Sequence, residues 1–105
     1  MQDQLDLLHR RLEHNPNDPD CLVELAREYA RLGQNAQAIA HLDLATEIEP
    51  AFAAAWVQKA ACQHAERDVD GARRSLEEAL SMAQANNDHN ATDAAAALAR
   101  QMEGE

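Results

Sequence analysis

Residues 22–50 read LVELAREYARLGQNAQAIAHLDLATEIEP, and the spacing of their apolar and small residues predicts the fold. Leucine, alanine and tyrosine recur three or four positions apart on both sides of Gly33, which is the period of an amphipathic helix. A glycine directly after the last apolar position is typical of the left-handed residue that ends a helix. This stretch therefore predicts two helices, over 19–32 and 36–48, with a short turn between them.

The same pattern returns thirty-four residues further along the chain. The matching positions are Leu22 and Trp56, Ala26 and Ala60, Ala38 and Ala72, Leu42 and Leu76, Ala45 and Ala79, and Ile48 and Met82. A fixed period of this length indicates helix pairs that bury their apolar faces against neighbouring copies. We expect further helices over 3–14, 52–66, 71–84 and 93–102, with Asp70 and Thr92 as caps of the last two.

The composition favours an all-α fold. Hydrophobic residues make up 46% of the chain, and Phe52, Trp56 and Tyr29 are its only aromatic residues. The apolar share is mainly alanine and leucine, which have high helix propensity. No run alternates between apolar and polar residues, so strands are not expected. At 105 residues the chain predicts one small domain, or the terminal part of a larger protein.

Charge and cysteine content exclude several functional classes. The formal net charge is −10 and the basic residues are scattered, which disfavours binding to nucleic acid. No apolar run approaches the roughly 20 residues of a membrane span, and no signal peptide is evident, so we expect a cytoplasmic protein without a membrane partner. Cys21 and Cys62 are too few and too far apart for a disulfide framework, and we interpret them as reduced core residues.

No sequence signature of catalysis, metal binding or cofactor binding is present. The segment Glu66-x-Asp68-x-Asp70-Gly71-x5-Glu77 has the carboxylate spacing of a calcium loop. Its first ligand would be glutamate instead of aspartate, Arg73 stands where an apolar residue should anchor the loop, and residues 72–77 are needed as helix. We therefore expect no enzyme activity, no metal and no cofactor, and we read the five histidines as surface residues of helices.

These residues resemble the tetratricopeptide repeat, a helix–turn–helix unit with the pattern W-x-x-L-G-x-x-Y, then A-x-x-x-F, then proline. The first copy reads Leu22-x-x-Leu25-Ala26-x-x-Tyr29, Ala38-x-x-x-Leu42, Ala45, Pro50, and the second reads Trp56-x-x-Lys59-Ala60-x-x-Gln63, Ala72-x-x-x-Leu76, Ala79. The chain looks like a small bacterial-type protein or domain of this family. The resemblance implies antiparallel helix–turn–helix repeats stacked as a short right-handed α-solenoid of about six helices. It divides the chain into a half-repeat helix (1–18), a first repeat (19–52), a second repeat (53–86) and a C-terminal capping helix (87–105).

In this family the first helix of each repeat lines a concave groove that binds a peptide or a partner helix, so the resemblance implies a non-catalytic protein-interaction module. The candidate groove residues are Val23, Arg27, Ala30, Arg31, Val57, Gln58, Ala61 and His64. Arg27 and Arg31 are four apart and suit a carboxylate, or they pair with Glu24 or Glu28 of the same helix. Members that bind chaperone tails use a lysine and asparagine clamp, but Val23 and Arg27 stand at the corresponding positions of the first repeat, so we do not expect that activity.

The partner is an unknown protein or peptide, and the chain is expected to be a monomer or a weak homodimer. The alternative function is structural: the terminal part of a longer repeat protein, or a self-associating module without a peptide ligand. Lys59 and Gln63 form a candidate irregular face, because they replace the leucine and tyrosine of the repeat pattern. Either this face is partly wet at the end of the array, with the lysine reaching solvent, or it meets a partner.

Overall fold

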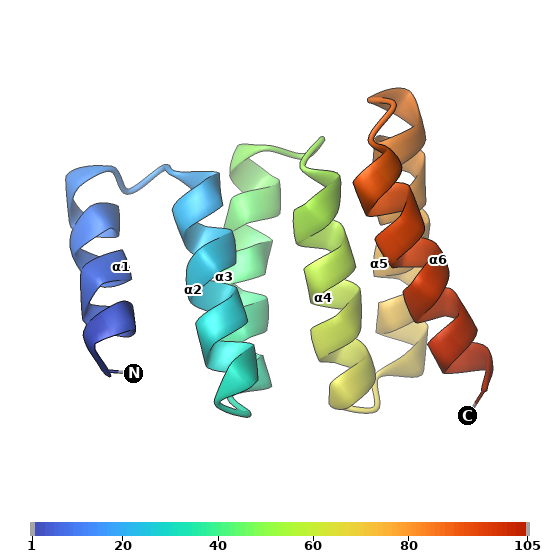
Figure 1. The fold of residues 1–105 in the computed structure, drawn as a ribbon, viewed down its shortest axis with the longest axis horizontal. Coiled ribbons are helices and arrows are strands. Elements are labelled where there is room, and N and C mark those ends of the chain that lie inside the picture. The colour runs from blue at the N-terminus through green and yellow to red at the C-terminus, as the bar shows by residue number, and fades with distance from the viewer. Residues whose placement is uncertain (1, 105) are drawn as a thin grey trace.

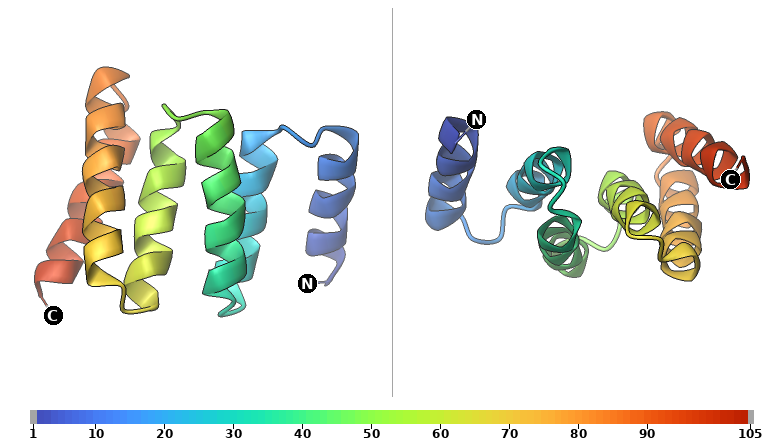
Figure 2. Two further views of the ribbon diagram at one scale, coloured as in Figure 1. Left: turned by 180° about the vertical axis from the view of Figure 1, so that it is seen from behind. Right: turned by 90° about the horizontal axis from the view of Figure 1, so that it is seen from below.

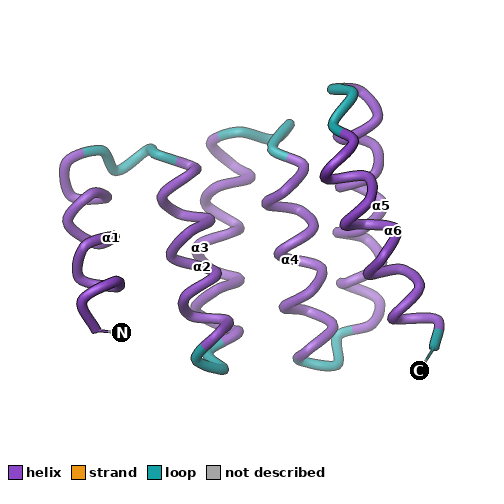
Figure 3. The backbone as a smooth tube through the Cα atoms, viewed as in Figure 1, coloured by secondary structure: helices purple, strands orange, loops and turns teal. Residues whose placement is uncertain are grey.

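The computed structural model describes residues 2–104, which form six α-helices joined by short turns (Figure 1). The helices are α1 (Gln2–His14), α2 (Pro19–Arg31), α3 (Asn35–Ile48), α4 (Ala53–Ala65), α5 (Val69–Ala85) and α6 (His89–Glu103). Figure 3 shows that helices and connecting loops account for the whole of this part, which contains no strand. The predicted all-α repeat architecture is therefore confirmed.

The helices are arranged as a short solenoid with principal extents of 38 × 28 × 19 Å. Successive helices run antiparallel, and α2 and α6 lie on one side of the array while α3 and α5 lie on the opposite side (Figure 2). In the described residues each helix contacts only helices one or two positions away in the chain, and α1 contacts α2 alone. Such nearest-neighbour packing is how repeat arrays build a continuous core.

Three helices begin at an aspartate whose side chain accepts a backbone N–H of the first turn. Asp18 accepts from Cys21 N at 3.3 Å, Asp68 from Gly71 N at 3.0 Å and Asp88 from Ala91 N at 3.0 Å. The predicted caps Asp70 and Thr92 are therefore wrong. Asp70 lies inside the first turn of α5, because the chain becomes helical two residues earlier than expected, and α6 likewise starts at His89 instead of at residue 93.

The turns inside the two repeats have the same backbone geometry at positions thirty-four apart. Gly33 has φ +79°, which confirms the left-handed glycine predicted after the first long helix. Arg67 holds the equivalent position with φ 65°, although a side chain makes this conformation unfavourable. The second turn therefore keeps the shape of the first at some cost in backbone strain.

Alanine lines most of the contacts between helices, which brings their backbones close together. Leu22 and Leu42 are completely buried in a first cluster that joins α2, α3 and α4, and Leu25 is completely buried in a cluster with Leu8 and Cys21. The alanines with no exposed surface are Ala26, Ala38, Ala45, Ala55, Ala60, Ala72, Ala79, Ala83 and Ala95. A second cluster is formed by Ala60, Leu76, Ala95 and Leu98, through which α6 covers α4 and α5. The buried apolar residues of the described helices thus form separate clusters that together extend from α1 to α6.

Tyr29 joins three helices at the N-terminal end of the array. Its hydroxyl lies 3.1 Å from Nε2 of His9 on α1. Its ring stacks on His41 of α3, with 5.2 Å between the ring centroids and 27° between the planes. His41 is held in turn by Nδ1, which lies 2.8 Å from the backbone oxygen of Gln37. This repeat-pattern tyrosine thus connects the half-repeat helix to the first repeat.

Candidate functional site

The candidate groove residues on α2 form a small exposed patch around two arginines. Arg27 and Arg31 are exposed, and Ala30 between them is half-buried. Arg31 donates to Glu28 Oε2 at 2.6 Å, and this hydrogen bond raises the pKa of Arg31. Pairing within the helix, one of the two interpretations of the sequence, therefore holds for Arg31. No ion pair of Arg27 is found within residues 2–104.

Glu24, the other predicted partner on α2, is occupied by a different helix. Arg11 of α1 donates to Glu24 Oε2 at 2.9 Å and lies 3.8 Å from Asp18 Oδ2. This pairing leaves Arg27 as the exposed cation of α2 whose charge is not offset by a close carboxylate in the described residues.

Two of the candidate groove residues pack toward the helix two positions further along the chain. Val23 is only 4% exposed and packs in the core with Ala55 and Cys62 of α4. Val57 is half-buried and packs against the cluster that contains Leu98 of α6. Val23 is thus a core residue in this structure and offers no surface to a ligand.

Two of the three remaining candidates on α4 border a hollow between α4 and α6. Gln58, Ala61 and His64 are half-buried. Ala61 and His64 line an open hollow of about 620 Å³, together with residues of the α4–α5 turn and Leu98 and Gln101 of α6. Because Arg27 and Ala61 are thirty-four residues apart, as are Ala30 and His64, the α2 patch and this hollow occupy equivalent faces of successive repeats.

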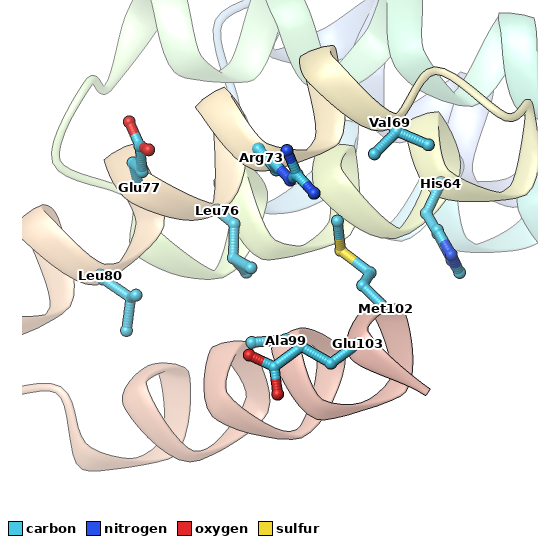
Figure 4. A pocket seen from close by; sticks show the side chains of 9 residues that line it. All are labelled: His64, Val69, Arg73, Leu76, Glu77, Leu80, Ala99, Met102 and Glu103. Carbon is cyan, nitrogen blue, oxygen red and sulfur yellow. The ribbon is translucent and has the colours of Figure 1, made fainter. Parts of the chain in front are cut away.

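A second cleft, which the sequence analysis did not identify, separates α5 from α6 (Figure 4). It has a volume of about 570 Å³. Leu76 and Leu80 of α5 and Met102 of α6 point toward one another across it, and Val69 at its edge is 45% exposed. The cleft depends on the angle at which α6 leaves α5. The spacing of apolar residues along α5 is the only sequence signal for it.

The candidate irregular face is satisfied within the chain. Lys59 Nζ lies 2.7 Å from Asp43 Oδ1 of α3 and 5.3 Å from the centroid of the Trp56 ring. Gln63 Oε1 accepts a hydrogen bond of 2.6 Å from Ser75 Oγ of α5. These two polar side chains therefore link α4 to the helices on either side of it.

Both cysteines are buried free thiols, as the sequence predicted. Burial raises the pKa of each, and Cys21 Sγ donates to the backbone oxygen of Leu8 at 3.2 Å. In residues 2–104 no three histidine, cysteine or acidic side chains are grouped so that they could hold a metal ion. Within the same part of the chain, no helix is both long and apolar enough to cross a membrane.

Comparison with known proteins identifies the repeat. The tetratricopeptide-repeat family model matches residues 19–52. No curated protein matches the chain significantly in sequence.

Solved structures with the same fold include three tetratricopeptide-repeat domains. The domain of Sgt2 from Aspergillus fumigatus is 25% identical, with a TM-score of 0.79 over 94% of this chain and 66% of that one. The TPR2B domain of yeast Sti1, solved as a complex with pHsp70, is 24% identical, with a TM-score of 0.77 over 90% of this chain and 81% of that one. The first such domain of Spaghetti (RPAP3), bound to the HSP90 peptide SRMEEVD, is 20% identical, with a TM-score of 0.77 over 94% and 77%.

Proposed function

Because the chain is a tetratricopeptide-repeat protein, we propose that it is a non-catalytic adaptor that binds a peptide or a helix of a partner protein across the face formed by α2 and α4. Repeat proteins of this architecture present an extended surface instead of a closed pocket, which suits peptides better than small substrates. The proposed setting is the cytoplasm, where Cys21 and Cys62 would stay reduced.

The observation that carries this proposal is the exposed guanidinium of Arg27. It lies on the repeat face shared with Ala61 and has no ion pair in the described residues. A carboxylate of a bound peptide could form a bidentate pair with it. Arg31, one helical turn away, would add a second positive charge, although Glu28 offsets part of it. The proposed ligand therefore carries an acidic side chain or a free C-terminus where it crosses α2.

The test starts from peptides selected for binding to the wild-type chain out of a random display library. The affinity of the best peptide is then measured for Arg27→Glu and for Arg74→Glu by calorimetry. Arg74 is the matched control, because it is also an exposed helical arginine but lies on α5. We expect Arg27→Glu to weaken binding about tenfold or more, since it replaces an attraction by a repulsion, and Arg74→Glu to leave binding within about twofold.

Equal affinity for the two variants would show that the peptide binds elsewhere and would refute the placement on α2. The peptide SRMEEVD serves as a further probe, because it occupies the structurally similar domain of RPAP3. Binding of SRMEEVD that Arg27→Glu abolishes would extend the proposal to chaperone tails, which the sequence at Val23 and Arg27 does not favour.

A further inference from the structure

Three turns of this protein share one backbone shape but differ in the residue at its left-handed position. The turns after α2, α4 and α5 place Gly33, Arg67 and Asn87 at φ 79°, 65° and 55°. In each turn the following residue donates its N–H to the backbone oxygen five positions earlier, at 2.8–2.9 Å. Glycine adopts a positive φ without strain and asparagine tolerates it, whereas a long side chain makes it unfavourable. The shape of the turn therefore accounts for Gly33 and Asn87 but not for Arg67.

Contacts within the chain do not account for Arg67 either. The residue is exposed, and no hydrogen bond or ion pair of its side chain is found in residues 2–104. The neighbouring carboxylate of Asp68 accepts the N–H of Gly71 as the cap of α5, and exposed Glu66 forms no ion pair in the same part of the chain. A strained residue with no contact to offset its cost is typical of a functional position. The guanidinium of Arg67 is thus free to bind a ligand.

Arg67 lines the hollow between α4 and α6, where the α4–α5 turn lies beside the C-terminal half of α6 (Figure 1). The hollow has a volume of about 620 Å³. Its other polar groups are His64 and Gln101, and the remaining lining is apolar and consists of Ala61, Ala65, Val69 and Leu98. No aspartate or glutamate of the described residues lines it, although the chain has 19 acidic residues and a formal net charge of −10. A basic hollow in an acidic protein favours a negatively charged group.

The lining of the hollow favours a carboxylate that is accompanied by an apolar side chain. The guanidinium of Arg67 matches a carboxylate in charge and binds both of its oxygens in a bidentate pair. A phosphate group carries a charge of about −1.5 to −2 and is usually recognised by a cluster of arginines, whereas this hollow contains one. Leu98 is 8% exposed, and together with Ala61 it offers apolar surface to a neighbouring side chain of the ligand.

We propose that this hollow is a second carboxylate site, in which Arg67 binds an acidic residue of the same peptide that Arg27 binds on α2. The second site rests on the proposed function above, because both arginines then contact one ligand. It deepens that function, because it specifies a ligand with two acidic residues at a fixed spacing and an apolar residue beside the second.

The spacing of the two acidic residues follows from the repeat geometry. Helices α2 and α4 are in contact, and packed helices lie about 8–10 Å apart. Arg67 lies six positions beyond Ala61, the α4 counterpart of Arg27, which corresponds to about 9 Å along the helix. The two displacements combine to about 13 Å, and an extended peptide advances about 3.3 Å per residue. The acidic residues of the ligand are therefore about four positions apart.

The test repeats the selection from the random display library in parallel with the wild-type chain, Arg27→Glu and Arg67→Gly. Arg67→Gly removes the guanidinium and installs the residue that the first turn carries, so the turn keeps its shape. Asn87→Gly is the matched control, because it makes the same kind of change at a left-handed position that does not line the hollow. Circular dichroism verifies that each variant is folded.

We expect the peptides selected by the wild-type chain to be enriched in acidic residues at two positions about four residues apart. Selection with Arg67→Gly should lose the enrichment at one of these positions, and selection with Arg27→Glu should lose it at the other. In calorimetry, the best wild-type peptide should bind Arg67→Gly about tenfold more weakly and Asn87→Gly within about twofold of the wild-type affinity. Replacing the second acidic residue of the peptide by its neutral amide should weaken binding to the wild-type chain but not to Arg67→Gly.

The outcomes separate the second site from the proposed function. If Arg27→Glu weakens binding and Arg67→Gly does not, the second site is overturned and the placement on α2 stands. If Arg67→Gly weakens binding and Arg27→Glu does not, the hollow is supported and the placement on α2 is refuted. A loss in Asn87→Gly equal to that in Arg67→Gly would overturn the role of the guanidinium. A library that yields no peptide bound by the wild-type chain would overturn both proposals.

Discussion

The ammonium group of Lys59 lies 2.7 Å from a carboxylate oxygen of Asp43 and thereby joins the first helix of the second repeat to the second helix of the first. The Lys59 side chain is 19% exposed, and the Asp43 side chain is 49% exposed. The Asp43 oxygen itself is buried and accepts no hydrogen bond from the described residues, so the ion pair with Lys59 is the contact that balances its charge. Lys59, which stands where the repeat pattern has leucine, thus connects the two repeats.

A double-mutant cycle measures this connection. Lys59→Met should lower the free energy of unfolding by about 1 kcal/mol, because it leaves the buried oxygen of Asp43 unpaired. The loss is no larger because both side chains are partly exposed, so solvent already weakens the ion pair in the wild-type protein. Combining Lys59→Met with Asp43→Ala should cost less than the sum of the single changes, with a coupling of about 0.5–1 kcal/mol in urea titrations. Additive effects would show that the two groups do not interact.

The attachment of α6 is tested by shortening its main apolar side chain. Leu98 is 8% exposed and packs against Ala60, Leu76 and Ala95. Leu98→Ala should cost about 2–3 kcal/mol in the free energy of unfolding, because it removes buried methyl groups and leaves a cavity. Leu44→Ala, at a leucine that is 42% exposed, should stay within about 0.5 kcal/mol in the same thermal melts. A similar loss for both would show that α6 is not held by this cluster.

The strained turn between α4 and α5 offers a stabilising substitution. Arg67 has φ 65°, whereas Gly33 occupies the equivalent position of the first repeat. Arg67→Gly should relieve the strain of the left-handed backbone conformation, although glycine also has greater freedom in the unfolded chain. The free energy of unfolding should rise by about 0.5–1 kcal/mol in balance. Chemical denaturation of the two proteins provides the measurement. A lower midpoint for the glycine variant would mean that the arginine side chain contributes more than the strain costs.

The buried thiols predict a loss of stability in alkaline solution. Burial raises the pKa of Cys21 and Cys62 in the folded protein. The thiols of the unfolded chain ionise first, near pH 8.5. Their contribution to the free energy of unfolding is therefore complete below that pH, and it is lost as the pH rises toward the higher pKa values of the folded protein. Between pH 7 and 9.5, wild-type stability should therefore fall more steeply than that of Cys21→Ala/Cys62→Ala. Parallel curves would contradict this linkage.

Much of this fold could be predicted because the repeat period constrains it. Positions thirty-four apart fix the number of helices, the turn at Gly33 and the buried faces of Leu42 and Ala45. The cap of α5 was mistaken because Asp68 and Asp70 can both accept N–H groups. The choice between them depends on where the chain first becomes helical.

The polar contacts could not be predicted because they depend on how neighbouring helices are rotated. Nothing in the sequence pairs Lys59 with Asp43, or Gln63 with Ser75, since these pairs join different helices. The burial of Val23 has the same origin: its position along α2 was predicted, but the approach of α4 decides its exposure.

The attachment of α1 to α2 alone has a consequence for how the native protein opens. Because no other described helix holds α1 in place, it can unfold and refold while the remaining five helices stay packed. The amide protons of α1 should then exchange with solvent through a local opening that costs far less free energy than global unfolding. Helix α4 contacts four of the other five helices, so its amide protons should exchange only when the whole domain unfolds. The free energy of local opening therefore differs along the chain and should be lowest for α1.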